Sequence, residues 1–173
     1  MKNPQLVRSH VNPIDGVSDS LFVACASYEE RTVLGVRKLS PRYRAQHSII
    51  CRAAEYKDKG KSSKYFEEIH KRLRNCSDAE PDEVQFGIEE PIDFIREFER
   101  KLNAHIAENP LQNVTVDITT FPRQELLILL KYLDSHLNRG NIRLLYGEPK
   151  KYATEEKNKE DRWLTGGVQS VHS

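Results

Sequence analysis

The sequence predicts an α/β fold with three layers, in which helices cover both faces of a parallel sheet of about five strands. Short apolar runs typical of buried strands alternate along the chain with longer segments of helical periodicity. The connections between them are short, which favours parallel strands joined by right-handed helical crossovers. At 173 residues, the chain has the length of one domain with a sizeable core.

Composition divides the chain into three parts. Residues 1–19 are polar and contain two prolines and a glycine, so we expect an extended lead-in. Residues 20–147 hold the alternating strands and helices of the Rossmann-like domain. Residues 148–173 begin with a highly charged stretch, which we interpret as a linker followed by a C-terminal segment. That segment is either one more edge strand or the point at which a longer protein continues.

The first strand is expected at residues 21–26, a continuous apolar run typical of a central parallel strand. Ser27 and Glu30 then fit the S-x-x-E capping box, with Ser27 as the N-cap and Glu30 at N3. The spacing predicts a helix from there to about residue 39, where a Ser-Pro pair ends it.

Two further strand and helix pairs follow. Both helices show apolar residues at helical spacing; Ser62 or Ser63 is the expected cap of the first, and Pro91 opens the second. The strands are expected at residues 47–51 and 83–87, and the helices end at about residues 75 and 108.

The fourth pair surrounds the most informative stretch, residues 117–125. Apolar residues alternate over 114–118, which predicts a strand, and the apolar run 126–130 predicts a helix buried on nearly every side. Thr119 and Thr120 are natural N-caps ahead of a proline. A polar break at residues 138–141 then leads to a fifth strand at 142–146.

Two strand orders fit this pattern. The Rossmann-like order 3-2-1-4-5 places strands one and four side by side at the switch point, where open α/β sheets bind ligands at their carboxyl ends. The flavodoxin-like order 2-1-3-4-5 would place strand three between them. We predict the first order, in which the polar junctions 27–31 and 117–125 share one crevice.

The first junction offers several ligand-binding candidates. Ser27 has a capping role and the capping box also explains Glu30, whereas Glu29 and Arg31 project from the first turn. Arg31 is suited to a charge-assisted bond with a phosphate or a carboxylate. Tyr28 either stacks on a base or packs against the helix.

The second junction combines a carboxylate, two hydroxyls and an arginine with a helix N-terminus. Asp117 follows a buried strand, where it would bind a ribose hydroxyl, act as a base or hold Arg123 in place. Thr119 and Thr120 offer hydroxyls and backbone N–H groups. Arg123 opposes the helix dipole, which suggests anion contact, whereas Glu125 is expected to be a dipole partner.

Composition excludes several classes of function. A formal net charge of +1 argues against nucleic-acid binding by bulk charge, and no apolar stretch is long enough to span a membrane. The three cysteines lack metal-ligand spacing and the six histidines are scattered, so we expect no metal and no cofactor. The protein is expected in the cytoplasm.

Both junctions carry a resemblance to known families. Asp117-Ile118-Thr119 resembles the ligand motif of the CRISPR-associated Rossmann-fold family that senses cyclic oligonucleotides, although the sequence Phe-Pro-Arg replaces that family's glycine-rich part. Residues 21–28 are similar to the first strand of TIR domains, which cleave nicotinamide dinucleotides. The first resemblance implies nucleotide sensing in a prokaryotic signalling or antiviral defence assembly.

We therefore predict a module that recognises a nucleotide or another phosphorylated ligand. The first alternative is a hydrolase or transferase acting on a glycosidic or phosphate bond, with Asp117, Glu29 or Glu30 as its acid or base. The second is a non-catalytic scaffold, whose crevice would be filled by its own side chains. A homodimer or a protein partner would make contact through the terminal segments.

Overall fold

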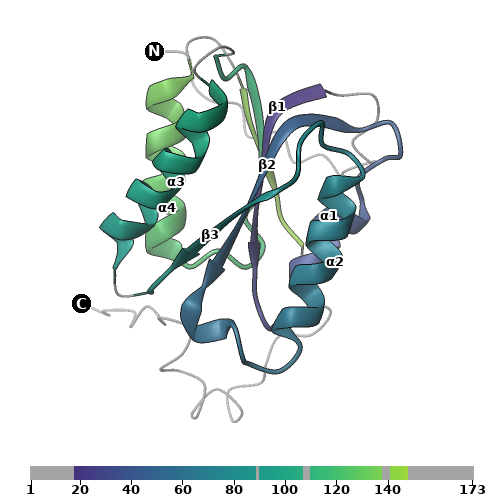
Figure 1. Cartoon of the computed structure of the whole chain (residues 1–173), viewed down its shortest axis with the longest axis vertical. Helices are drawn as coiled ribbons and strands as arrows, with labels where there is room; N and C mark the ends of the chain where they lie inside the picture. The colour runs from purple at the N-terminus through teal and green to yellow at the C-terminus, as the bar shows by residue number, and fades with distance from the viewer. Residues whose placement is uncertain (1–17, 89, 107–109, 138–140, 148–173) are drawn as a thin grey trace, which may run out of the picture.

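A computed structural model describes residues 18–88, 90–106, 110–137 and 141–147, and within them the chain forms one all-parallel sheet of five strands (Figure 1). The order is β3-β2-β1-β4-β5, which confirms the Rossmann-like prediction. β1 pairs directly with both β2 and β4, so no strand separates the two polar junctions. The strands are β1 (Ser18–Ala26), β2 (Arg44–Ala53), β3 (Asp82–Phe86), β4 (Asn113–Asp117) and β5 (Asn141–Leu145).

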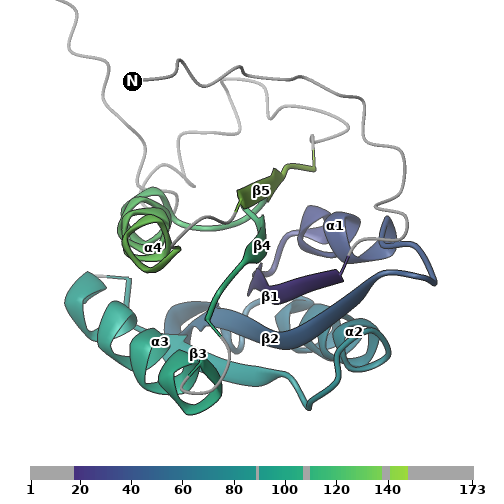
Figure 2. The ribbon, with the colours of Figure 1, turned by 90° about the horizontal axis from the view of Figure 1, so that it is seen from above.

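Helices cover both faces of the sheet, with α3 (Pro91–Ile106) and α4 (Arg123–His136) on one face and α1 (Leu34–Arg37) and α2 (Ser62–Arg74) on the other (Figure 2). β1 is buried by both layers because successive side chains of a strand point to opposite faces. Its residues Leu21, Val23 and Cys25 belong to the core under α3 and α4, while Phe22 and Ala24 belong to the core under α1 and α2. This burial on both faces explains the continuous apolar run.

The expected lead-in and the charged C-terminal segment lie almost entirely outside the described residues. β1 begins at Ser18, inside the span expected to be extended lead-in. None of the helices in the described part of the chain is both long and apolar enough to cross a bilayer.

The helix predicted after β1 is wrong in its start and its length. A 3-10 helix, η1 (Glu30–Val33), precedes the single turn of α1, and the residue that caps η1 is Glu29, without a side-chain hydrogen bond. The capping box does not form because the Thr32 hydroxyl accepts a bond from the N–H of Ser27, at 3.3 Å, and donates to the carbonyl of Cys25, at 2.7 Å. Thr32 therefore satisfies backbone groups at the end of β1 in a tight bend.

The caps predicted for two other helices are also wrong. α2 has Lys61 at its N-cap, so Ser62 is already helical, and Pro122 occupies the N-cap of α4. Thr119 and Thr120 lie in the turn before Pro122, where the Thr119 hydroxyl accepts a bond from the N–H of Gly147 and the Thr120 hydroxyl donates to the carbonyl of Cys25. These tertiary partners compete with capping for the same side chains.

Candidate functional site

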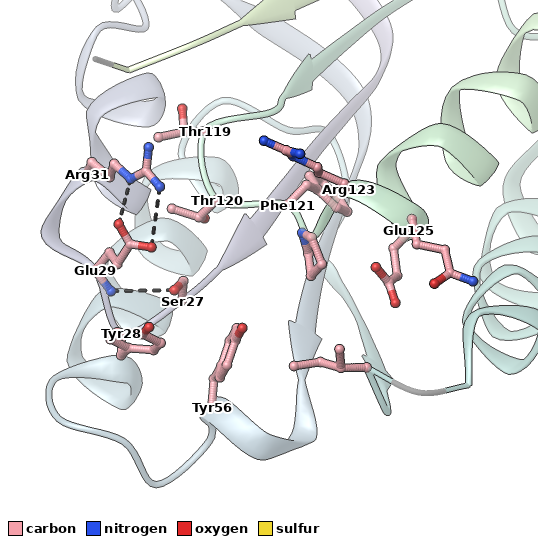
Figure 3. Close-up of a pocket in the computed structure, with 13 residues that line it drawn as sticks. Ser27, Tyr28, Glu29, Arg31, Tyr56, Thr119, Thr120, Phe121, Arg123 and Glu125 are labelled. Carbon is pink, nitrogen blue, oxygen red and sulfur yellow. Dashed lines mark hydrogen bonds and ion pairs between the residues drawn. The ribbon is translucent and has the colours of Figure 1, made fainter. Parts of the chain in front are cut away.

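A cavity of about 280 Å³ opens at the carboxyl ends of β1 and β4 (Figure 3). Its location is the switch point of the sheet, where the chain leaves β1 and β4 toward opposite faces. Both polar junctions contribute to the cavity, together with the segments that follow β2 and β3. It is lined by Ser27, Tyr28, Glu29, Arg31, Tyr56, Ile88, Thr119, Thr120, Phe121, Pro122, Arg123, Gln124 and Glu125.

Two threonines fasten the junctions to each other. The hydroxyls of Thr32 and Thr120 both donate to the carbonyl of Cys25 at 2.7 Å, and they lie 3.1 Å apart. Thr32 follows β1 and Thr120 follows β4, so this group of bonds crosses the floor between the two strand ends. The relative position of the two junctions is thereby fixed by hydrogen bonds as well as by strand pairing.

Two arginines lie on opposite sides of the cavity, with Thr119 and Thr120 between them (Figure 3). Arg31 is held by Glu29, with nitrogen-to-oxygen distances of 2.6 and 3.3 Å. Burial lowers the pKa of Arg31, but the bond with Glu29 outweighs it, so that the pKa is raised and the guanidinium stays charged. Arg123 is exposed and, within the described segments, pairs with no carboxylate.

The first turn of α4 presents backbone donors to the same space. The N–H of Leu126 bonds to the carbonyl of Pro122 at 3.0 Å, which closes the first intrahelical bond. The preceding N–H groups, those of Arg123, Gln124 and Glu125, have no carbonyl one turn earlier in the helix. All three residues line the cavity, so the positive end of a 14-residue helix faces it.

Two tyrosines form the aromatic side of the cavity. The rings of Tyr28 and Tyr56 meet edge to face, with centroids 5.1 Å apart and planes at 83°. Burial and the neighbouring Tyr28 raise the pKa of Tyr56 to about 12, so its phenol keeps its proton at neutral pH. Figure 3 shows both hydroxyls directed toward the cavity. Tyr28 was expected either to stack on a base or to pack against the helix, and in the structure its ring packs against that of Tyr56.

Asp117 lies behind the cavity and is not among the residues that line it. Its side chain is 2% exposed and is directed to the face covered by α1, where Oδ2 contacts Gly35. Oδ1 accepts bonds from the backbone N–H of Thr119, at 3.1 Å, and from its hydroxyl. Burial raises the pKa of Asp117 to about 6, and the bonds from Thr119 limit the rise. The position of Asp117 is that of a support for the turn after β4.

The remaining predicted residues divide between the cavity and the surface. Ser27, Glu29, Thr119 and Thr120 line the cavity along with the two arginines and Tyr28. Glu30 is exposed in η1 and does not line it. Thr119 also accepts a bond from the N–H of Gly147 at 2.9 Å, which ties the end of β5 to the turn after β4.

Several lining residues were not predicted to belong to the site. Tyr56 and Ile88 follow the ends of β2 and β3, and the rule that ligands bind at the carboxyl ends of parallel strands would have found them. Phe121, which follows the two threonines directly, also lines the cavity. Glu125, expected only to complement the helix dipole, is 1% exposed, and its Oε1 is buried without a hydrogen-bond partner among the described residues.

The described residues contain no group of three or more histidine, cysteine or acidic side chains that would hold a metal ion. The three cysteines are buried and free. Burial raises the pKa of the Cys25 thiol beneath the cavity far above its ordinary value, which keeps it protonated and unreactive.

Comparisons with family models, with curated proteins and with solved structures gave no match, so the interpretation of this site rests on the geometry and chemistry of its own residues.

Proposed function

We propose that this protein recognises a phosphorylated small molecule, a nucleotide in particular, in the cavity at the carboxyl ends of β1 and β4. The observation that carries the proposal is the convergence of Arg31, Arg123 and the first turn of α4 on one cavity. Guanidinium groups bind phosphate through pairs of charge-assisted hydrogen bonds, and helix N-termini present free backbone N–H groups to it.

The availability of Arg123 supports this assignment. Its guanidinium extends over the cavity from the first turn of α4, where a cation opposes the helix dipole. An anion between the two arginines would offset that unfavourable interaction. The anion would also compete with Glu29 for Arg31. The Glu29 carboxylate is about one-third exposed and so has room to move away from Arg31.

The other side of the cavity suits the non-phosphate part of a nucleotide. The rings of Tyr28 and Tyr56, with Ile88 and Phe121, form an apolar wall for a base or a sugar. A volume of about 280 Å³ lies near the lower limit of roughly 300 Å³ for ligand sites. A mononucleotide therefore matches the cavity better than a larger ligand held entirely inside it.

The binding role is better supported than the two alternatives. Of the three carboxylates expected for a nucleotide-processing enzyme, Asp117 and Glu30 do not line the cavity, and Glu29 is engaged by Arg31. A scaffold was expected to fill its crevice with its own side chains, whereas this crevice is open. Placement in a prokaryotic signalling or defence assembly is a proposal that follows from the sequence resemblance alone.

The test is a thermal-shift and calorimetric screen of nucleoside mono-, di- and triphosphates, with inorganic phosphate included. A ligand at 100 times its Kd stabilises a folded protein by about 2.7 kcal/mol, which for this chain length raises Tm by about 5–10 °C. We expect Arg123→Ala to weaken binding by about 10- to 100-fold, the effect of one charge-assisted hydrogen bond.

The matched control is Arg96→Ala, because Arg96 is exposed on α3, pairs with nearby Asp93 at 3.4 Å, and does not line the cavity. Binding in this variant should equal that of the wild type. A screen in which no phosphorylated compound binds at millimolar concentration would overturn the proposal, as would binding that Arg123→Ala leaves unchanged.

A further inference from the structure

Glu125 presents a buried acceptor atom, Oε1, for which the described part of the chain supplies no donor. The side chain is 1% exposed, and Oε1 has no hydrogen-bond partner among the described residues. Most buried polar atoms in folded proteins are paired, because a group removed from water without a partner destabilises the fold by about 1–3 kcal/mol. An orphan acceptor in the wall of a cavity is therefore a group available to a ligand.

The carboxylate of Glu125 is directed into the cavity between Tyr56 and the first turn of α4 (Figure 3). Two other residues that line this cavity, Tyr56 and Phe121, are aromatic and are each 92% buried. Burial raises the pKa of Glu125, nearby Glu55 raises it further, and the backbone N–H of Glu125 itself acts in the opposite direction. No cation within the described segments pairs with this carboxyl group.

The cavity thus has two chemically different sides. Arg123 directs its guanidinium toward the side of Arg31, whereas Glu125, two residues later, directs its carboxylate toward Tyr56 (Figure 3). A phosphate satisfies the first side. The second requires hydrogen-bond donors on a flat or ring-shaped group that fits beside aromatic rings.

We propose that Glu125 is the specificity residue of this site, accepting hydrogen bonds from two adjacent donors on the non-phosphate part of the bound nucleotide. This inference rests on the proposed function and deepens it. Two parts of a nucleotide carry such donors: the vicinal hydroxyls of ribose, and the N1–H and N2 amino group of guanine. Adenine offers no such pair of donors at the equivalent edge, and a 2′,3′-dideoxyribose lacks both hydroxyls.

The experiment measures the affinities of GMP, AMP, 2′,3′-dideoxy-GMP and inorganic phosphate for the wild type, Glu125→Gln and Arg123→Ala. Glutamine keeps the length of the side chain but replaces one acceptor oxygen by a donor. We expect Glu125→Gln to bind the preferred nucleotide at least about 10-fold more weakly, and to bind inorganic phosphate as the wild type does.

The wild-type affinities identify which donor pair is used. If GMP and dideoxy-GMP bind equally and AMP at least 10-fold more weakly, Glu125 reads the guanine edge. If GMP and AMP bind equally and dideoxy-GMP more weakly, it reads the ribose. In either case the preference should disappear in Glu125→Gln.

Failure of this inference is distinguishable from failure of the proposed function. Nucleotide binding that depends on Arg123, with the same preferences in wild type and Glu125→Gln, would overturn the role of Glu125 and leave the phosphate site standing. Absence of binding by every probe would overturn both. Folding of each variant is checked by circular dichroism. Glu125→Asp, which withdraws the carboxylate by one methylene, provides a second variant with the same expected loss of preference.

Discussion

Gly35 of α1 and Asp117 at the end of β4 are packed so closely that a methyl group on Gly35 would overlap the carboxylate, with its carbon 2.7 Å from Cγ. Glycine is required here by the close approach of a helix to a side chain, and not by an unusual backbone angle. The contact brings α1 down onto the end of β4, next to the turn that forms one wall of the cavity. It also explains why Asp117 is directed away from the cavity.

Gly35→Ala should therefore destabilise the protein by about 1–3 kcal/mol, the typical effect of overpacking a core. A loss of stability would point to the close contact with Asp117, because alanine in place of glycine within a helix ordinarily stabilises the helix by about 1 kcal/mol. Chemical denaturation of the wild type and the variant measures the change in the free energy of unfolding.

A double-mutant cycle with Asp117→Ala separates this contact from other effects of the new methyl group. Removing the carboxylate creates the space that the methyl group needs, so Gly35→Ala should be less harmful in the Asp117→Ala background by at least about 1 kcal/mol. Equal effects in both backgrounds would show that the two residues do not constrain each other.

The buried carboxyl group of Asp117 predicts a particular dependence of stability on pH. Its pKa is about 6 in the folded protein, raised from an ordinary value of 3.8, so the folded state keeps a proton that the unfolded state releases. The free energy of unfolding should thus fall as pH rises from about 4 to about 6, by about 3 kcal/mol from this group. Asp117→Asn should remove that contribution.

The measurement is urea denaturation of both proteins at several values of pH between 3.5 and about 7.5, a range set to bracket the two pKa values. Carboxylates with lowered pKa, such as that of Asp82, contribute a change of the opposite sign, so the difference between the two curves is the informative quantity. The control is Asp93→Asn, an exposed carboxyl group on α3. Parallel curves for the wild type and Asp117→Asn would contradict the prediction.

The threonine bonds at the floor of the cavity predict a third effect. Thr32→Val keeps the shape of the side chain but leaves the buried N–H of Ser27 without its acceptor, and should destabilise the fold by about 1–3 kcal/mol. Thr120→Val should have a smaller effect, because Thr120 is less buried and the carbonyl of Cys25 keeps its bond from Thr32.

Because both hydroxyls donate to one carbonyl, the double variant should lose more stability than the sum of the two single variants. Thermal and chemical denaturation of the wild type, the two single variants and the double variant gives the interaction energy between the two threonines. Strict additivity would indicate that the two threonines act independently of each other.

The sequence by itself determined the layered α/β fold and left two strand orders, of which the structure has the predicted 3-2-1-4-5. Residues 21–26 are apolar without interruption, which is typical of a strand that is covered by helices on both faces. The alternation of strands with helical segments predicted that the strands run parallel, as they do. The position of the site follows from that topology, because the carboxyl ends of β1 and β4 must meet at the switch point.

The tertiary structure decided which side chains face the cavity. Asp117 and Glu125 are both acidic residues at the same junction, yet the first is buried against Gly35 and the second is directed into the cavity. Asp117 is the last residue of β4 and Glu125 lies in the first turn of α4, and which of them reaches the cavity depends on how these two elements pack against their neighbours. In the same way the capping box at Ser27 was overridden by Thr32, whose hydroxyl satisfies backbone groups that no local pattern relates to it.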